Sequence, residues 1–142
     1  MRWVLDTDVM VAAFRSDAGA SRRLLIAALQ RRIELLVSVP LVIEYEAVLT
    51  RPVHLQASRL TATDVIAVLD AVVAVAEPVR LAFLWRPALR DPDDDMILEA
   101  AVNGAADAVV TFNRRDFARG AGAFGLDVLT PGDALRRLEE RR

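Results

Sequence analysis

Four aspartates fall within five positions of the segment RDPDDDMILEAA, at Asp91, Asp93, Asp94 and Asp95. One aspartate before a helix is ordinary, because its carboxylate accepts hydrogen bonds from free backbone N–H groups and complements the helix dipole. Four of them repel one another and exceed what capping requires. The segment is therefore either a solvated acidic loop or a place where a cation binds.

Other carboxylates stand at positions that suggest a shared site. Asp6 ends the apolar run RWVL, with Asp8 two residues later, and Glu44 lies among apolar residues in PLVIEYEAVL. Asp116 follows a second short apolar run, AVVT. Carboxylates without His or Cys are the ligands that Mg²⁺ and Mn²⁺ prefer. Two simpler interpretations stay open, in which Asp6 caps a helix and Glu44 faces solvent.

Composition excludes several kinds of chemistry. The chain has no Cys and no Lys, which removes disulfides, thiolate metal sites, a Cys nucleophile and lysine-amine catalysis. His54 is the single histidine and follows Arg51-Pro52, where we expect a surface loop, so a Ser-His-Asp triad is not expected. The near balance of 18 basic and 20 acidic residues implies no polyelectrolyte partner.

Length and hydropathy indicate one compact domain. The 142 residues, 54% of them hydrophobic, suffice for a sizeable core, and no linker or repeat divides residues 1–142. Asp6 and Asp8 interrupt the N-terminal apolar run too early for a signal peptide, and no uncharged run is long enough to span a membrane. We therefore expect a cytoplasmic protein without membrane contact.

Hydrophobic periodicity predicts short strands alternating with helices. Strands are expected over residues 2–5, 33–38, 79–84, 108–111 and 127–129. Helices are expected over residues 20–31, 40–49, 61–76, 94–103 and from 131 onward, and residues 118–125 are expected to form a loop. This alternation predicts an α/β fold with a mainly parallel sheet. Ligand sites of such sheets lie beyond the carboxyl ends of the strands, where Asp6, Asn113 and Asp116 would fall.

Three segments carry a resemblance to a known family. VLDTDVMVAAF, LLVSVPLVIEYEAVLTRP and DPDDDMILEAAVNGAADAVVTFNRRDF resemble the acid-bearing segments of the PIN domain, a family of metal-dependent ribonucleases that includes VapC-like toxins. The resemblance covers nearly the whole chain. It implies a three-layer α/β/α fold and hydrolysis of RNA phosphodiester bonds with Mg²⁺ or Mn²⁺. It further implies a cognate antitoxin protein and a homodimer.

The resemblance also implies a set of site residues. Asp6, Glu44 and either Asp94 or Asp95 correspond to the acids that bind metal, with Asp116 as a weaker fourth acid. Many family members carry an acid at this turn, where the chain has Asn113. Many VapC-like members resemble this chain in having asparagine there.

The choice between Asp94 and Asp95 depends on which face of their helix meets the site. Adjacent helical residues point about 100° apart, so the two cannot play equivalent roles. Asp94 is favoured because its face keeps Glu99 further from the buried side.

Several arginines are candidates for holding phosphates, because guanidinium groups bind them in a bidentate manner. They are Arg15, Arg22, Arg23, Arg114 and Arg115. For each of them a solvated surface position is the competing interpretation.

Three rival functions remain in view. The stretch LDTDV resembles the nucleophile loop of haloacid-dehalogenase-type phosphatases, with Asp6 as nucleophile and Asp8 as acid/base, but it leaves Glu44 without a role. A receiver-like signalling domain requires an Asp after a middle strand and a Lys, whereas Ser38 stands there and Lys is absent. A PIN-like module that binds RNA or a partner without cleaving is the third.

Overall fold

The structure, a computed structural model, describes residues 1–16, 18–82 and 92–141, apart from the side chains of residues 92, 93 and 119. Five strands belong to the described part: β1 (Arg2–Leu5), β2 (Glu34–Val37), β3 (Glu77–Pro78), β4 (Ala108–Val110) and β5 (Asp127–Leu129). The helices of the described part are α1 (Thr7–Arg15), α2 (Ala20–Leu29), α3 (Val39–Leu49), α4 (Pro52–Ser58), α5 (Ala62–Val75), α6 (Pro92–Asn103), α7 (Arg114–Ala123) and α8 (Pro131–Glu140).

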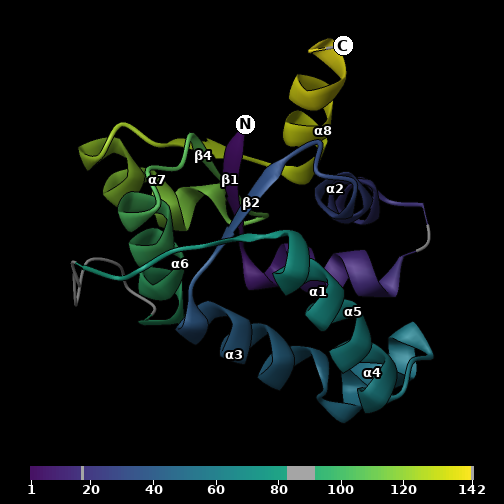
Figure 1. Cartoon of the computed structure of the whole chain (residues 1–142). Coiled ribbons are helices and arrows are strands. Elements are labelled where there is room, and N and C mark those ends of the chain that lie inside the picture. The colour runs from purple at the N-terminus through teal and green to yellow at the C-terminus, as the bar shows by residue number, and fades with distance from the viewer. Residues whose placement is uncertain (17, 83–91, 142) are drawn as a thin grey trace.

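The strands form one parallel sheet in the order β3-β2-β1-β4-β5. Figure 1 shows α6 and α7 on one side of the sheet and α2 and α8 on the other. The prediction of a three-layer α/β/α fold with a parallel sheet is confirmed. The chain order reverses between β1 and β4, and the crevice at such a reversal is where parallel sheets bind ligands.

Buried apolar strands explain why the sheet forms where it does. Trp3, Val4 and Leu5 of β1 are at most 1% exposed, as expected of a central strand covered on both faces. At the amino-terminal edge, the guanidinium of Arg2 pairs with Glu34 and Glu77 and donates to the carbonyl oxygen of Gly104 at 2.6 Å. That contact joins β1, β2, β3 and the end of α6.

Local capping signals set the helix starts. The Ser38 hydroxyl accepts from the backbone N–H of Leu41 at the start of α3, and Pro40 occupies its first turn. Thr61 and Asp64 form the reciprocal capping box predicted for α5. In Figure 1, α3, α4 and α5 lie at the lower side of the view, beyond the carboxyl end of β1. In the part of the chain that the structure describes, no helix is long and apolar enough to cross a membrane.

Three local predictions were wrong. The strand expected over residues 79–84 is instead β3 at Glu77–Pro78, paired with Leu36 and Val37, and residues 83 and 84 lie outside the described residues. A proline is tolerated there because β3 is an edge strand. Residues 118–125 were expected to form a loop, but α7 continues to Ala123 because Phe117 and Ala121 are buried on one of its faces. His54 lies on α4 and is half-buried, not in a loop.

Replacing Gly104 with Ala should destabilise the fold, because the turn after α6 has no room for a Cβ. The added atom would lie 2.8 Å from Val79 Cγ2, 2.9 Å from the carbonyl oxygen of Ala100 and 2.9 Å from Leu36 Cδ1. We expect a loss of about 1–3 kcal/mol in the free energy of unfolding, measured with urea. Gly122→Ala is the control, since nothing lies within 4 Å of its added Cβ. It should gain about 0.5 kcal/mol from helix propensity. Equal effects of the two changes would contradict the packing argument.

Candidate active site

Two neighbouring strands bring their carboxyl ends together at the middle of the sheet. Asp6 follows β1, and its backbone N–H donates to the carbonyl oxygen of Val110 at 2.9 Å. Thr111 follows β4, and its backbone N–H donates to the carbonyl oxygen of Leu129 at 2.8 Å. The polar side chains of both residues therefore start from backbone that the sheet holds in place.

The Asp6 carboxylate is buried, 6% exposed, and hydrogen-bonded at both oxygens. The Thr111 hydroxyl donates to Oδ2 at 2.7 Å, and the backbone N–H of Thr7 donates to Oδ1 at 2.7 Å. The second contact is a helix cap for α1. The capping interpretation of Asp6 is thus confirmed. It does not exclude a ligand role, because the cap uses Oδ1 while Oδ2 points toward Thr111 at the end of the next strand.

Asp8 lies beside Asp6 in the first turn of α1. Its Oδ2 accepts from the backbone N–H of Phe112 at 3.3 Å and from the Asn113 side-chain amide at 3.2 Å. Asn113 is the N-cap residue of α7, but its side chain makes no cap hydrogen bond there. Asp8 Oδ1 is buried and has no hydrogen-bond partner among the described residues. A buried carboxylate oxygen without a donor is costly unless a cation compensates it.

Burial and mutual repulsion make this pair hard to ionise. Burial, followed by the negative charge of Asp8, raises the pKa of Asp6 to about 7, against the hydrogen bonds from Thr111 and Thr7 that lower it. Burial also raises the pKa of Asp8, while contacts with Asp6 and with the N–H groups of Phe112 and Val9 lower it and the charge of Asp94 raises it further. At neutral pH the two carboxylates compete for one proton, so a cation bound there would displace it.

The acidic cluster contributes through α6. Asp94 is half-buried, and its charge acts on Asp8. Asp95 and Glu99 are each 1% exposed and lie four residues apart on the same helix face. The sequence argument for Asp94 assumed that Glu99 stays away from the buried side, and that assumption was wrong. The assignment of either aspartate as a metal ligand stays a prediction.

Glu44 is half-buried on α3, next to a residue that ties this helix to the site. Tyr45 is 1% exposed, and its hydroxyl donates to the carbonyl oxygen of Leu5, the residue before Asp6. Burial, with the nearby charge of Asp6, raises the pKa of Tyr45 well above its usual value. The tyrosine therefore stays protonated and holds α3 against the end of β1.

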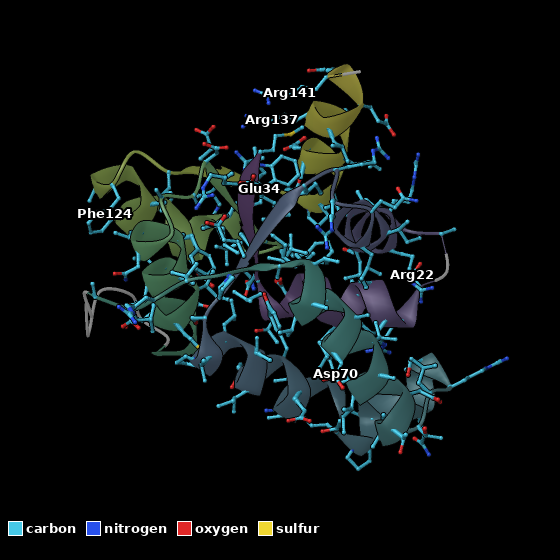
Figure 2. The ribbon with its side chains drawn as sticks, viewed as in Figure 1. Arg22, Glu34, Asp70, Phe124, Arg137 and Arg141 are labelled. Atoms are coloured by element: carbon cyan, nitrogen blue, oxygen red, sulfur yellow. The ribbon has the colours of Figure 1, made fainter. Side chains whose placement is uncertain are left out.

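The remaining candidates take no part in the hydrogen bonds described above for this pair. Asp116 is exposed in the first turn of α7, where it complements the helix dipole, and Arg15, Arg114 and Arg115 are exposed. Arg22 donates to the carbonyl oxygens of Ala13 and Phe14 at the end of α1 (Figure 2). Asp91 and the side chain of Asp93 lie outside the described residues.

The donor set fits a hard cation. The buried Asp6, the half-buried Asp8 and the nearby Asp94 all offer carboxylate oxygens, which are the ligands that Mg²⁺ and Mn²⁺ prefer. Oδ1 of Asp8 has no hydrogen-bond partner among the described residues. Within residues 1–16, 18–82 and 92–141, no three acidic or histidine side chains already stand together as an ion-holding group. A complete ligand set at one point therefore stays a prediction.

Glu99 and the Thr111 hydroxyl were missed as site-region residues. An acid embedded among apolar residues in MILEAAV carries the same signal that singled out Glu44, so Glu99 was detectable. The link between Thr111 and Asp6 joins residues 105 positions apart, and no local pattern shows it.

Comparison with known proteins identifies the family. Residues 2–115 match the PIN domain, so the chain belongs to the PIN domain family, a family of nucleases, as the sequence predicted. The crystal structure of VapBC2 from Rickettsia felis bound to a DNA fragment from their promoter has a similar fold. Its TM-score is 0.60 at 17% identity, over 92% of this chain and 98% of that chain. No curated protein matches the chain. Family membership removes the phosphatase and receiver alternatives.

The stability of the metal-free protein should fall as pH rises toward neutrality because of Asp6. Its folded-state pKa of about 7 lies above the ordinary 3.8, so between these values the folded state binds the extra proton. The stabilisation is complete below pH ~4 and is lost as pH rises through ~7, a change on the order of a few kcal/mol. Urea unfolding in EDTA should show this slope in the wild type and a smaller one in Asp6→Asn.

A divalent ion should reverse the loss. At pH 7.5, Mn²⁺ should raise the melting temperature of the wild type and leave that of Asp6→Asn nearly unchanged, because an ion that binds only the folded state stabilises it. In the urea experiment above, equal slopes of unfolding free energy against pH for the wild type and Asp6→Asn would show that Asp6 does not titrate as described.

Proposed function

We propose that the protein is a divalent-metal-dependent endoribonuclease and the toxin of a toxin–antitoxin pair. The observation that carries the proposal lies at the reversal point of the sheet, where the buried Asp6 stands beside the half-buried Asp8. Oδ1 of Asp8 is buried there without a hydrogen-bond partner among the described residues. Membership of a nuclease family and the fold shared with VapBC2 support it.

Asp6, Asp8 and Asp94 would hold the ion, with Asp95 and Glu44 as further candidates from the sequence. A bound Mg²⁺ or Mn²⁺ lowers the pKa of a coordinated water and offsets charge on a phosphodiester. The protein's own contribution is orientation. Thr111 and the N–H of Thr7 fix the Asp6 carboxylate, while Asn113 and the N–H of Phe112 fix one oxygen of Asp8.

Exposed arginines would supply the positive charge that an RNA backbone requires. Arg114 is 58% exposed at its side chain and makes only a loose ion pair with Asp133, at 3.9 Å, and Arg115 beside it is exposed. Guanidinium groups at the start of α7 would contact phosphates flanking the cleaved bond. Arg15 lies at the other end of α1 and would serve a more distant phosphate.

The partner proposal comes from the fold neighbour and from the family. VapBC2 was crystallised bound to a DNA fragment from their promoter. By analogy, this chain would form a pair with a cognate antitoxin that inhibits it, and a small DNA-binding protein encoded beside it would support the pairing.

An exposed apolar surface supports a homodimer. Val39 and Ile43, one turn apart on α3, are 73% and 60% exposed, and Ile66 and Val73 on the neighbouring α5 are also exposed. Burying such side chains against a second copy would be favourable. Sedimentation of the wild type and of Ile43→Asp would test this, with a shift to monomer expected for the variant.

Asp6→Asn should abolish metal-dependent RNA cleavage while leaving the chain folded. Even outer partners of metal ligands contribute about 10–100-fold, so loss of a direct ligand should exceed about 100-fold in cleavage rate. The assay is cleavage of structured and unstructured RNA with Mn²⁺, with Mg²⁺ and with EDTA. Asp70→Asn, an exposed aspartate on α5 (Figure 2), is the matched control and should cleave normally. Comparable cleavage by Asp6→Asn would remove Asp6 from the mechanism.

Asp94→Asn should cost more activity than Asp95→Asn, because the charge of Asp94 already acts on Asp8. We expect about 10-fold or more weaker Mn²⁺ binding and slower cleavage for Asp94→Asn. Asp91→Asn and Asp93→Asn should change little. Normal metal binding by Asp94→Asn together with an inactive Asp95→Asn would show that the ligand is the neighbouring residue.

A further inference from the structure

An aromatic side chain stands exposed at the edge of the candidate active site. Phe112 is 53% exposed, although it directly follows the buried Thr111 that holds Asp6. A phenyl ring left this far in water contributes little burial energy to the fold. A ring in this position, next to the carboxylate pair, is available to contact a bound substrate.

The backbone fixes where this ring can be. The N–H of Phe112 donates to Asp8 Oδ2 at 3.3 Å, and the N–H of Asn113 donates to the Thr111 hydroxyl at 2.9 Å. The ring of a phenylalanine extends only a few ångströms from its own backbone nitrogen, so it stays within roughly 8 Å of the Asp8 carboxylate. A base on the ring and a phosphate at the carboxylates could therefore belong to neighbouring positions of one nucleic-acid strand.

The charges around Phe112 match one strand of a nucleic acid. The backbone N–H of Phe112 donates to Asp8, and Arg114 and Arg115 follow Phe112 closely in the chain as the first two residues of α7. Aromatic rings interleaved with arginines along a backbone track are how proteins hold unpaired strands, since every base offers a face for stacking.

We propose that Phe112 is a stacking platform for an unpaired nucleobase next to the cleaved phosphate. The inference rests on the proposed ribonuclease function and assigns to Phe112 the contact with the base beside the cleaved phosphate. In a duplex the bases are already stacked and paired, so the ring cannot reach a free face.

The test compares side chains at position 112 on one RNA in two forms. Phe112→Ala should lower kcat/KM about 10-fold on an unpaired oligonucleotide and weaken its binding in EDTA by a similar factor. Phe112→Trp should retain both quantities, and Phe112→Leu should resemble Phe112→Ala, because leucine is apolar but cannot stack. The same RNA annealed to its complement should be a poor substrate for the wild type.

Phe124→Ala is the matched control. Phe124 is a second exposed phenylalanine, 40% exposed, just beyond the far end of α7 (Figure 2). Its replacement should leave kcat/KM and RNA binding unchanged. Thermal unfolding of all variants verifies that they are folded.

Three results would overturn the platform. They are unchanged kcat/KM and binding for Phe112→Ala, full activity of Phe112→Leu, or equal losses on single-stranded and duplex RNA. Normal RNA handling by Phe112→Ala with lost antitoxin binding would assign the ring to a protein interface instead. If the wild type cleaves no RNA at all, the proposed function fails, and the EDTA binding comparison alone then decides whether Phe112 stacks a base.

Discussion

The candidate site depends on one constraint: the buried carboxylate of Asp6 is held beside the half-buried carboxylate of Asp8. Repulsion between Asp6 and Asp8 would drive them apart if their backbones could move. They cannot, because Asp6 is hydrogen-bonded into the sheet and Asp8 belongs to the first turn of the helix that Asp6 caps. The metal-free protein therefore retains the repulsion between the two carboxylates, and a bound cation would relieve it.

The same constraint explains the polar residues after β4. Thr111 and Asn113 supply the side-chain donors to the pair, one for each carboxylate. An acid at position 113 would add a third negative charge and remove a donor to Asp8. The asparagine at this turn is therefore consistent with a site whose further carboxylates are predicted to come from another element, at Asp94 or Asp95 of α6.

Much of this arrangement was predictable from the sequence, and the reasons for the failures are physical. Asp6 was expected at the carboxyl end of an apolar strand, and it lies there beside Thr111 of the neighbouring strand end, because parallel strands end together. The register at Asp94 and Asp95 was not decidable by an apolar stripe, since Ile97, Leu98, Glu99, Ala100 and Ala101 are all buried. A helix covered on most sides has no single stripe to read. The end of α7 was missed because its glycines outweighed the two buried anchors, Phe117 and Ala121.

The long separation between the donors and their carboxylates has a consequence for the synthesis of the protein. The Thr111–Asp6 and Asn113–Asp8 hydrogen bonds each join residues 105 positions apart. While β4 is still inside the ribosome, a growing chain has Asp6 and Asp8 but neither of these donors. Its β1 can pair with β2 but not yet with β4. The hydrogen-bonded carboxylate pair can therefore form only after nearly four-fifths of the sequence has emerged.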